Sequence, residues 1–222
     1  MQSSAFMRLQ MLPFFQGISQ DELLRILERA KFDFVSLETG ELIAEQGRVA
    51  SHLVYALNGK FQAQCRFSEV FYVVEELDAP FVFQPESLFG VSPTWRYTLT
   101  PLSDAQLLLI SKHDFLHHLM DFPTFRLSLL NYLCGLSDKS ASRLLLPPSP
   151  DLRSSLLRFF EEHVMHKRGK KTFHVGMQHL ADSLSVSRLS VSRCLRCLQE
   201  EGLIELGRQE ITIPDFTLLQ NG

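Results

Sequence analysis

The spacing of hydrophobic positions changes along the chain and divides its first half into two regions. In residues 12–31, leucine and isoleucine recur near a 3.6-residue period after the turn at 17–19, which predicts a short amphipathic helix. From residue 32 to about residue 110, short β-rich runs alternate with turn residues. Asn58-Gly59 lies between two such runs and is a strong hairpin signal, because both residues tolerate positive φ. This region predicts a small β barrel or roll.

From residue 111 onward the pattern becomes helical. A short helix is predicted over 112–120 and a long one over 123–146, where Pro123 suits the first helical position. The long helix carries two apolar stripes, which are Leu129, Leu133 and Leu136 on one side and Leu127, Leu130 and Cys134 on the other. Two apolar faces need two partners. The second partner is either another copy of the chain in a coiled-coil dimer or the interior of the same domain. In the dimer, Leu129, Leu133 and Leu136 are expected to form the seam.

Prolines at 147, 148 and 150 end this helix and predict a hinge over 147–150. Residues 151–166 then predict another amphipathic helix. Its apolar stripe comprises Leu152, Leu156, Phe159, Phe160 and Val164.

Residues 172–213 show a helix–turn–helix pattern followed by a β-hairpin wing. Apolar residues at 177, 180, 181 and 184 form one helical face, and Ser187 is placed to cap the next helix. On that second helix Val191, Cys194, Leu195 and Leu198 point to one side. Leu189, Arg193 and Arg196 point to the other side, and Arg188 flanks them in the first turn. Such a helix can bury one face and place a cationic face in a DNA major groove.

The net charge of −3 argues weakly against nucleic-acid binding, but the charge is unevenly distributed. Between residues 166 and 199 only Asp182 opposes seven cations, which are Lys167, Arg168, Lys170, Lys171, Arg188, Arg193 and Arg196. This local excess is either a footprint for phosphate groups or a solvated protein face.

Composition and motifs exclude several other classes of protein. No apolar run has the length of a membrane span and the first ten residues lack a secretory core, so we expect a cytoplasmic protein. The four cysteines predict reduced thiols, and no metal site or cofactor is predicted: Cys194 and Cys197 lie within a helix without a second pair. No phosphate loop or nucleophile motif is present, so we expect no enzyme and no catalytic residue. A ligand-binding module whose helical tail mediates protein contacts is the main alternative to a DNA-binding regulator.

Three segments resemble the cyclic AMP receptor (CRP/FNR) family of bacterial transcription regulators. "LADSLSVSRLSVSRCLRCLQEEGLIELGRQEITI" is similar to the family's DNA-binding domain, and "ETGELIAEQGRVASHLVYALNGKFQA" to half of its cyclic-nucleotide-binding β roll. "LPFFQGISQDELLRIL" resembles its N-terminal helix. The resemblance implies an α+β chain with a β-roll sensor at 1–122 and a central dimerisation helix at 123–146. After the hinge at 147–150, it implies a winged helix-turn-helix at 151–222.

The resemblance also implies partners and DNA-contacting residues. The partners are double-stranded DNA with a palindromic operator, a second copy of the chain and RNA polymerase. The base-reading positions map onto Ser187, Arg188, Leu189 and Arg193. Arginine suits guanine, and Leu189 can contact a thymine methyl but cannot accept a hydrogen bond from cytosine. Further DNA contacts are expected from Ser190, Ser192, Arg196 and Lys171.

The resemblance fails at the residues that bind the cyclic nucleotide. The family's phosphate-binding Arg position falls on Trp95 and the following hydroxyl position on Arg96, while the ribose-binding Glu becomes Val91 or Gln84. Cyclic AMP is therefore not expected as the effector, because burying its phosphate without a paired cation is costly. The expected pocket residues are Phe81, Phe83, Gln84, Phe89, Val91, Trp95 and Arg96. Their aromatic rings either line a site for an uncharged, apolar effector or fill the core themselves.

Overall fold

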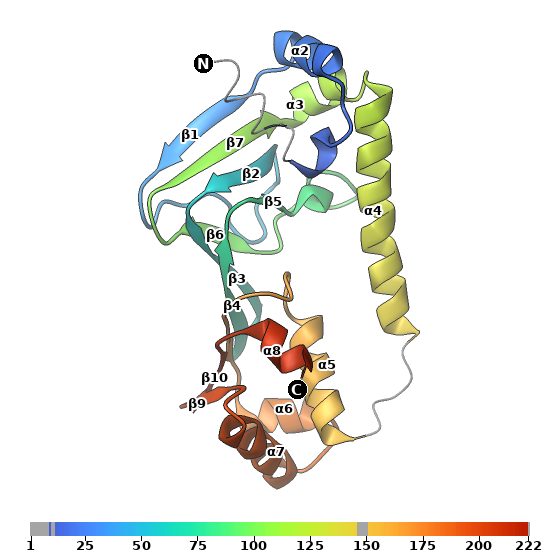
Figure 1. The fold of residues 1–222 in the computed structure, drawn as a ribbon. Helices are drawn as coiled ribbons and strands as arrows, with labels where there is room; N and C mark the ends of the chain where they lie inside the picture. The colour runs from blue at the N-terminus through green and yellow to red at the C-terminus, as the bar shows by residue number, and fades with distance from the viewer. Residues whose placement is uncertain (1–8, 10–11, 146–150, 222) are drawn as a thin grey trace. The chain divides into compact units, whose positions relative to one another are not determined.

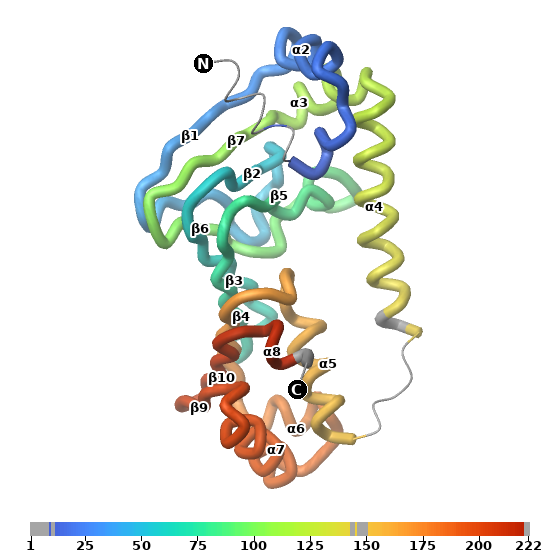
Figure 2. Tube along the Cα trace, viewed as in Figure 1, coloured from blue at the N-terminus to red at the C-terminus, as the bar shows by residue number. Residues whose placement is uncertain are grey.

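The computed structural model describes residue 9, residues 12–145 and residues 151–221, so the hinge predicted at 147–150 lies outside the described residues. Contacts divide the chain into two compact units. The first unit comprises Met1–Lys60, Asp78–Arg96 and Thr100–Leu146, and the second comprises Phe61–Leu77, Tyr97–Leu99 and Pro147–Gly222. The predicted division of the chain is therefore wrong in one respect: two segments within 1–122 belong to the same unit as the C-terminal helices. Figures 1 and 2 show the course of the chain.

The first unit contains a four-stranded antiparallel sheet with the order β1-β7-β2-β5 among its described residues. The strands are β1 (Asp33–Leu37), β7 (Ala105–Ser111), β2 (His52–Asn58) and β5 (Phe81–Phe83). Val54 of β2 pairs with Leu109 on one side and with Phe83 on the other. This arrangement confirms the β-rich character predicted for residues 32–110.

The first unit also contains helical segments before, between and after these strands. They are the 3₁₀ turns η1 (Pro13–Phe15) and η2 (Pro85–Leu88), helix α2 (Gln20–Arg29), helix α3 (Lys112–Asp114), the π-helical turn η3 (Phe115–Leu119) and helix α4 (Pro123–Leu144). The single helix predicted over 12–31 is wrong, because Gly17 takes a φ of 81° and Ser19 caps a new helix at α2. The single helix predicted over 112–120 is likewise divided into α3 and η3.

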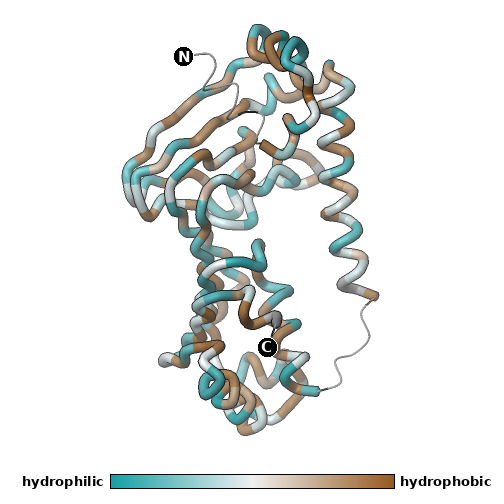
Figure 3. Tube along the Cα trace, viewed as in Figure 1, coloured by the Kyte–Doolittle hydropathy of each residue, from teal (hydrophilic) through white to brown (hydrophobic). Residues whose placement is uncertain are grey.

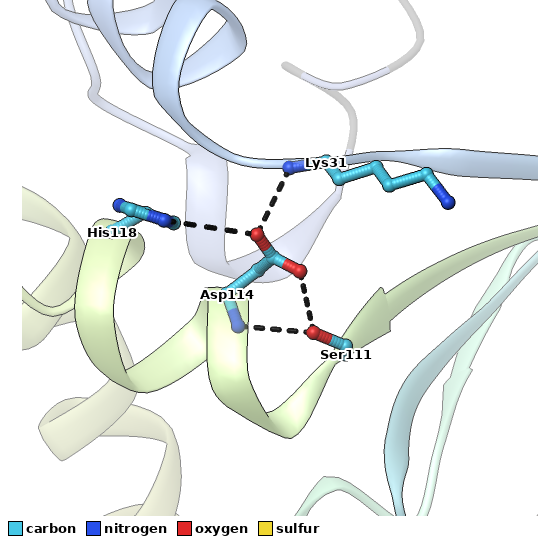
Figure 4. A network of polar contacts seen from close by, with 4 residues as sticks. All are labelled: Lys31, Ser111, Asp114 and His118. Atoms are coloured by element: carbon cyan, nitrogen blue, oxygen red, sulfur yellow. Dashed lines mark hydrogen bonds and ion pairs between the residues drawn. The ribbon is translucent and has the colours of Figure 1, made fainter.

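One apolar core joins the helices of the first unit to its sheet. Phe14 of η1 packs edge-on against Tyr55 of β2 and Phe125 of α4, and all three side chains are buried. At the end of β7, the Asp114 carboxylate accepts hydrogen bonds from the Ser111 hydroxyl and the Lys31 backbone N–H, as Figure 4 shows. These contacts connect α3 and its N-cap, Ser111, to the segment that follows α2.

The second unit is built on a sheet with the order β6-β3-β4-β8-β10-β9. Its strands are β6 (Thr98–Pro101), β3 (Lys60–Ser68), β4 (Phe71–Asp78), β8 (Lys171–His174), β10 (Glu210–Ile213) and β9 (Glu205–Gly207). Only Thr98 and Leu99 of β6 belong to the second unit, because the first unit resumes at Thr100. β4 and β8 pair antiparallel, so Tyr72 is opposite His174 and Glu75 is opposite Lys171. The β3–β4 hairpin (residues 60–78) thereby extends the sheet that contains the wing strands.

Helices α5 (Leu152–Glu162), α6 (Met177–Ser183), α7 (Arg188–Glu200) and α8 (Phe216–Asn221) complete the second unit. Asp151 caps α5 by accepting from the Ser154 N–H, and the buried residues of α5 confirm most of the predicted stripe. Phe71 and Val73 of the hairpin share one apolar core with residues of all four helices. A continuous core of this kind is what makes the hairpin part of this unit.

Candidate nucleic-acid interface

Helices α6 and α7 form the predicted helix–turn–helix. Leu180 and Ala181 of α6 are buried, as are Val191, Leu195 and Leu198 of α7, so both helices contribute the apolar faces that the sequence predicts. The connection turns sharply at Ser185, whose φ of 56° lies in the left-handed region. The Ser187 hydroxyl accepts a hydrogen bond from the Ser190 N–H at 3.1 Å, which confirms the predicted cap.

The opposite face of α7 is cationic and open to solvent. Arg188, Arg193 and Arg196 are exposed, and among the described residues no carboxylate forms an ion pair with them. Leu189 is exposed between them, whereas Ser190 and Ser192 are half-buried. Polar and apolar positions are interleaved along the helix in Figure 3. This face can bring guanidinium groups and one apolar side chain to a DNA groove without first breaking an ion pair.

A bidentate ion pair fixes the C-terminal end of α7 to α5. The Arg153 guanidinium donates to the two carboxylate oxygens of Glu201 at 2.6 and 2.8 Å. This hydrogen bonding raises the pKa of Arg153 and lowers the pKa of Glu201. The pair holds α7 against α5. It also neutralises the charge of Glu201, which lies at the C-terminal end of α7.

The wing adds a cation that the sequence analysis did not single out. Strands β9 and β10 are joined at Arg208 and Gln209, both exposed, and Gln209 adopts a φ of 58°. The sequence signal was available, because Arg208 occupies the tip of the predicted hairpin. Arg208 is therefore a further candidate for contact with a phosphate group.

Lys171 does not belong to this exposed surface, and its predicted role as a DNA contact is wrong for this structure. Its side chain is fully buried, and its Nζ lies 3.0 Å from an oxygen of Glu75, which is also fully buried. The Glu75 carboxylate further accepts from the backbone N–H groups of Met165 at 2.6 Å and His166 at 3.2 Å. Burial raises the pKa of Glu75, and the charge of Lys171 opposes that rise. A sequence signal existed in β4, where Glu75 falls on the same strand face as Phe71 and Val73.

Two more lysines of the cationic segment are also paired. Lys167 contacts Glu161 at 2.6 Å, and Lys170 contacts Glu76 at 2.9 Å. The excess positive charge predicted for residues 166–199 is therefore smaller at the surface than the sequence suggests. The cations that remain exposed outside ion pairs in the described part of this segment are Arg168, Arg188, Arg193 and Arg196.

In the first unit, the residues predicted to form an effector pocket do not converge on one site. Trp95 lines a cavity of about 170 Å³, and the Phe83 ring packs against Trp95 at 5.4 Å between centroids. Phe89 instead packs against Phe115, and Phe81 is half-buried in β5. The other residues around the cavity are Val35, Leu37, Leu42, Ile43, Ser51, His52, Val54, Leu107 and Leu109. Sequence reasoning missed these residues, because six of them come from alternate positions of the separate strands β1, β2 and β7. The other three, Leu42, Ile43 and Ser51, come from the segment between β1 and β2.

Polar contacts occupy the residues that replace the family's nucleotide-binding groups. The Arg96 guanidinium lies 3.8 Å from the Glu86 carboxylate, and the Arg96 backbone N–H donates to the Gln84 side chain at 3.1 Å. Gln84 is buried and holds a φ of 39° at the start of η2. Val91 is fully exposed, so its predicted place in a pocket is wrong. Arg96 is exposed as well and does not line the cavity.

Within the first unit, one side of helix α4 packs against the apolar core, and the other side is exposed. Leu129 is buried in the core of the first unit, while Leu133 and Leu136 are half-buried, so the stripe predicted at the dimer seam is largely an intramolecular one. The second stripe is the open one: Leu127 is 60% exposed, Leu130 is 57% exposed and Cys134 is exposed. Any partner of this helix would have to cover the second stripe.

Other chemistry has little support in the described residues. No group of three or more His, Cys, Asp or Glu side chains in that part of the chain is arranged to hold a metal ion. Among the helices described, none combines the length and the apolar character that a membrane crossing requires.

Comparison with known proteins places these features in a family context. Residues 152–221 match the family described as the Crp-like helix-turn-helix domain. A search of curated proteins finds no match to the chain. The structure is similar to the catabolite activator protein of Thermus thermophilus, with 22% identity, a TM-score of 0.52, and coverage of 94% of this chain and 97% of that one.

A second similar structure is DNR from Pseudomonas aeruginosa, with 23% identity, a TM-score of 0.50, and coverage of 100% of this chain and 98% of that one. The separate sensor domain of the transcriptional regulator DNR matches with 23% identity and a TM-score of 0.50, covering 64% of this chain and 98% of that domain. At these identities the likeness establishes the fold. The chain therefore has the mixed α/β fold of the CRP/FNR transcription regulators, and its residues 152–221 form a Crp-like helix-turn-helix domain.

Proposed function

We propose that this protein is a sequence-specific DNA-binding transcription regulator that reads its operator with α7. The observation that carries the proposal is the cationic face of the capped second helix in a helix–turn–helix, which is exposed and forms no ion pair with the described residues. In this proposal Arg188 and Arg193 read guanine by donating two hydrogen bonds each, and Leu189 contacts a thymine methyl. Arg196 and Arg208 then contact phosphate groups, as do the hydroxyls of Ser187, Ser190 and Ser192.

The active form is a homodimer that binds a palindromic operator. The support is the open stripe of Leu127, Leu130 and Cys134 on α4. These positions follow i, i+3 and i+7, so they form one seam on a helix and are suited to pack against the same seam of a second copy. Twofold symmetry then places two copies of α7 on half-sites about one helical turn of DNA apart.

The effector, if one binds in the first unit, is an uncharged and largely apolar molecule rather than cyclic AMP. The cavity beside Trp95 is small and lined mainly by aliphatic side chains. Arg96 is directed to Glu86 instead of the cavity. A cyclic phosphate would thus be buried without a cation, which carries a large desolvation cost.

The test of DNA recognition compares two arginine variants in full-length protein. Bound duplexes are first selected from native genomic fragments, and affinity for the selected site and for random DNA is then measured by fluorescence anisotropy at several salt concentrations. Arg193→Ala should weaken specific binding by about 1–3 kcal/mol and relax the base preference at one position. Arg29→Ala, which removes an exposed arginine from α2 in the other unit, is the matched control and should change neither affinity. If Arg193→Ala binds both DNAs as tightly as wild type, α7 is not the reading helix.

A further inference from the structure

Helix α7 carries two cysteines three residues apart, Cys194 and Cys197. Cys197 is exposed, whereas Cys194 is half-buried and packs against the apolar core of the second unit. The other two cysteines are placed differently: Cys65 is buried in β3, and Cys134 belongs to the first unit. The helix that the proposed function assigns to DNA reading therefore combines a thiol that solvent reaches with a second thiol beside it.

The two thiols are neighbours on the surface of α7. Side chains three residues apart on a helix have Cβ atoms about 5–6 Å from each other. Burial raises the pKa of the Cys194 thiol, and the proximity of Cys197 adds to that rise. Cys194 is thus held in the protonated form, while Cys197 is open to soluble oxidants. An exposed thiol with a second thiol next to it is typical of a reversible oxidation site.

A disulfide between these two positions requires a change in α7. The Cβ atoms of a disulfide lie about 3.5–4.5 Å apart, which is closer by roughly 1–2 Å than a regular helix allows. The backbone around Leu195 and Arg196 must therefore leave helical geometry. The Glu201 N–H donates to the Cys197 carbonyl at 3.0 Å, so a shift of Cys197 also disturbs the last turn of the helix.

The segment between the cysteines lies within the cationic face of α7. Arg193 directly precedes the pair and Arg196 lies inside it, and both side chains are exposed. Bidentate donation to a base requires a defined position of the guanidinium group, so a displaced backbone weakens that contact. Leu195 is fully buried, and its packing opposes a rotation of the whole helix that could restore the position of the arginines.

We propose that Cys194 and Cys197 form an oxidation site in α7, at which a peroxide produces a disulfide that distorts the helix and releases DNA. This inference rests on the proposed DNA-binding function. It adds to that function a chemical class of reactant, a peroxide, and the two side chains that react with it.

The chemistry proceeds in two steps. In the first step a sulfur–oxygen bond forms between Cys197 and hydrogen peroxide while the oxygen–oxygen bond breaks, which gives a sulfenic acid and one water that takes up the thiol proton. In the second step the Cys194 sulfur attacks the sulfur of the sulfenic acid. The sulfur–sulfur bond forms, the sulfur–oxygen bond breaks, and the hydroxyl group leaves as a second water with the proton of Cys194. The two thiols are oxidised and the peroxide is reduced.

The experiment uses full-length protein that has been treated with hydrogen peroxide and then freed of it. Peptide mapping by mass spectrometry should find the Cys194–Cys197 disulfide as a loss of two hydrogen atoms. Amide hydrogen exchange should become faster in residues 194–201, whereas β8 keeps its protection. Fluorescence anisotropy should show an affinity for the selected duplex lower by about tenfold or more, the size of one lost bidentate base contact. Dithiothreitol should reverse all three changes.

Three variants assign the effect to the pair. Cys194→Ser and Cys197→Ser each leave one thiol in α7, and each should prevent both the disulfide and the reversible loss of affinity. Cys134→Ser removes the exposed cysteine of the first unit and is the matched control, which should respond to peroxide like wild type. Every variant is compared with its own reduced form, so that an effect of the substitution on unoxidised protein cancels.

The outcomes separate this inference from the proposed function. If reduced wild type does not prefer the selected duplex to random DNA, the proposed function fails and control of DNA binding fails with it, while peptide mapping still decides whether the oxidation site exists. If peroxide yields no Cys194–Cys197 disulfide, or if the disulfide leaves exchange in α7 and DNA affinity unchanged, the inference is overturned and DNA binding stands. A loss of affinity that dithiothreitol does not reverse, or that persists in Cys197→Ser, belongs to other oxidised side chains and also overturns it.

Discussion

The buried pair of Glu75 and Lys171 permits a sharp prediction about stability. Both side chains are inaccessible to solvent, and their charged atoms lie 3.0 Å apart. Removing either partner leaves the other charge buried without a counterion, a change that typically costs about 3–5 kcal/mol. We therefore expect Glu75→Leu and Lys171→Met each to lower the free energy of unfolding of the second unit by about that amount.

The double variant Glu75→Leu, Lys171→Met should behave very differently from either single variant. An apolar pair of similar volume loses the ionic attraction but also escapes the desolvation cost, and such replacements are often neutral or stabilising by about 1–4 kcal/mol. The Met165 and His166 N–H groups lose their acceptor in this variant, which offsets part of the gain. A double-variant close to wild-type stability then implies a coupling energy of several kcal/mol between the two positions.

The assay can separate the two units, since Trp95 is the sole tryptophan and belongs to the first unit. Urea unfolding followed by tryptophan fluorescence reports that unit, while far-ultraviolet circular dichroism reports both. The single variants should shift the circular dichroism transition without shifting the fluorescence transition to the same extent. Single variants that cost under about 1 kcal/mol would refute the reasoning, because losses that small are typical of solvated ion pairs.

Comparing wild type with the double variant also tests a predicted pH dependence of stability. Burial raises the pKa of Glu75, so the native state takes up a proton more readily than the unfolded chain. The resulting stabilisation is complete below the ordinary glutamate pKa and is lost as the pH rises through the raised pKa. The difference in stability between wild type and the double variant contains this contribution, and an opposite slope in that difference would contradict it.

Three further predictions concern the first unit. Leu130→Asp should convert the dimer to a monomer in light scattering without lowering the stability read by Trp95, because Leu130 is exposed within its own unit; a wild-type monomer at micromolar concentration would refute the seam. The hydrogen bond from Ser111 lowers the pKa of Asp114, so its stabilising effect is present above the ordinary aspartate pKa and is lost as the pH falls through the lowered one; Asp114→Asn should flatten acid unfolding followed by fluorescence, and an unchanged curve would contradict this. Titration calorimetry should detect no cyclic AMP binding at micromolar concentrations, and binding that Arg96→Ala abolishes would show that the family mechanism operates after all.

Local sequence patterns were sufficient to predict the helix–turn–helix. Its apolar periodicity, its serine cap and its wing depend on residues close together in the chain, and the structure confirms each of them. The exposed face of α7 followed from the same periodicity. The division of the first predicted helix also depends on neighbouring residues. Gly17 takes a positive φ and Ser19 caps α2, and both residue types are typical of a turn between two helical segments.

The long-range features escaped prediction for a physical reason. Periodicity shows that α4 has two apolar stripes, but it does not show which of them η1 and the sheet will cover. The leucines at 129, 133 and 136 were assigned to the dimer seam, while the structure buries Leu129 inside its own unit. The choice depends on the direction in which the helix packs, and that direction is set by distant residues such as Phe14.

Lys171 is a second case in which local sequence does not show long-range packing, and here the error changed a predicted DNA contact. Seen alone, a lysine in a cationic stretch before a helix–turn–helix is a reasonable phosphate contact, and only strand pairing with a hairpin far upstream reverses that interpretation. Glu75 carried half of the signal, because a carboxylate on the apolar face of a strand must find a buried counterion or accept a proton. The two anomalies explain each other only when considered together. An acidic residue on an apolar strand face and a cationic segment elsewhere in the chain should therefore be examined together for a buried ion pair. The cations available to bind DNA should be counted only after such pairs have been subtracted.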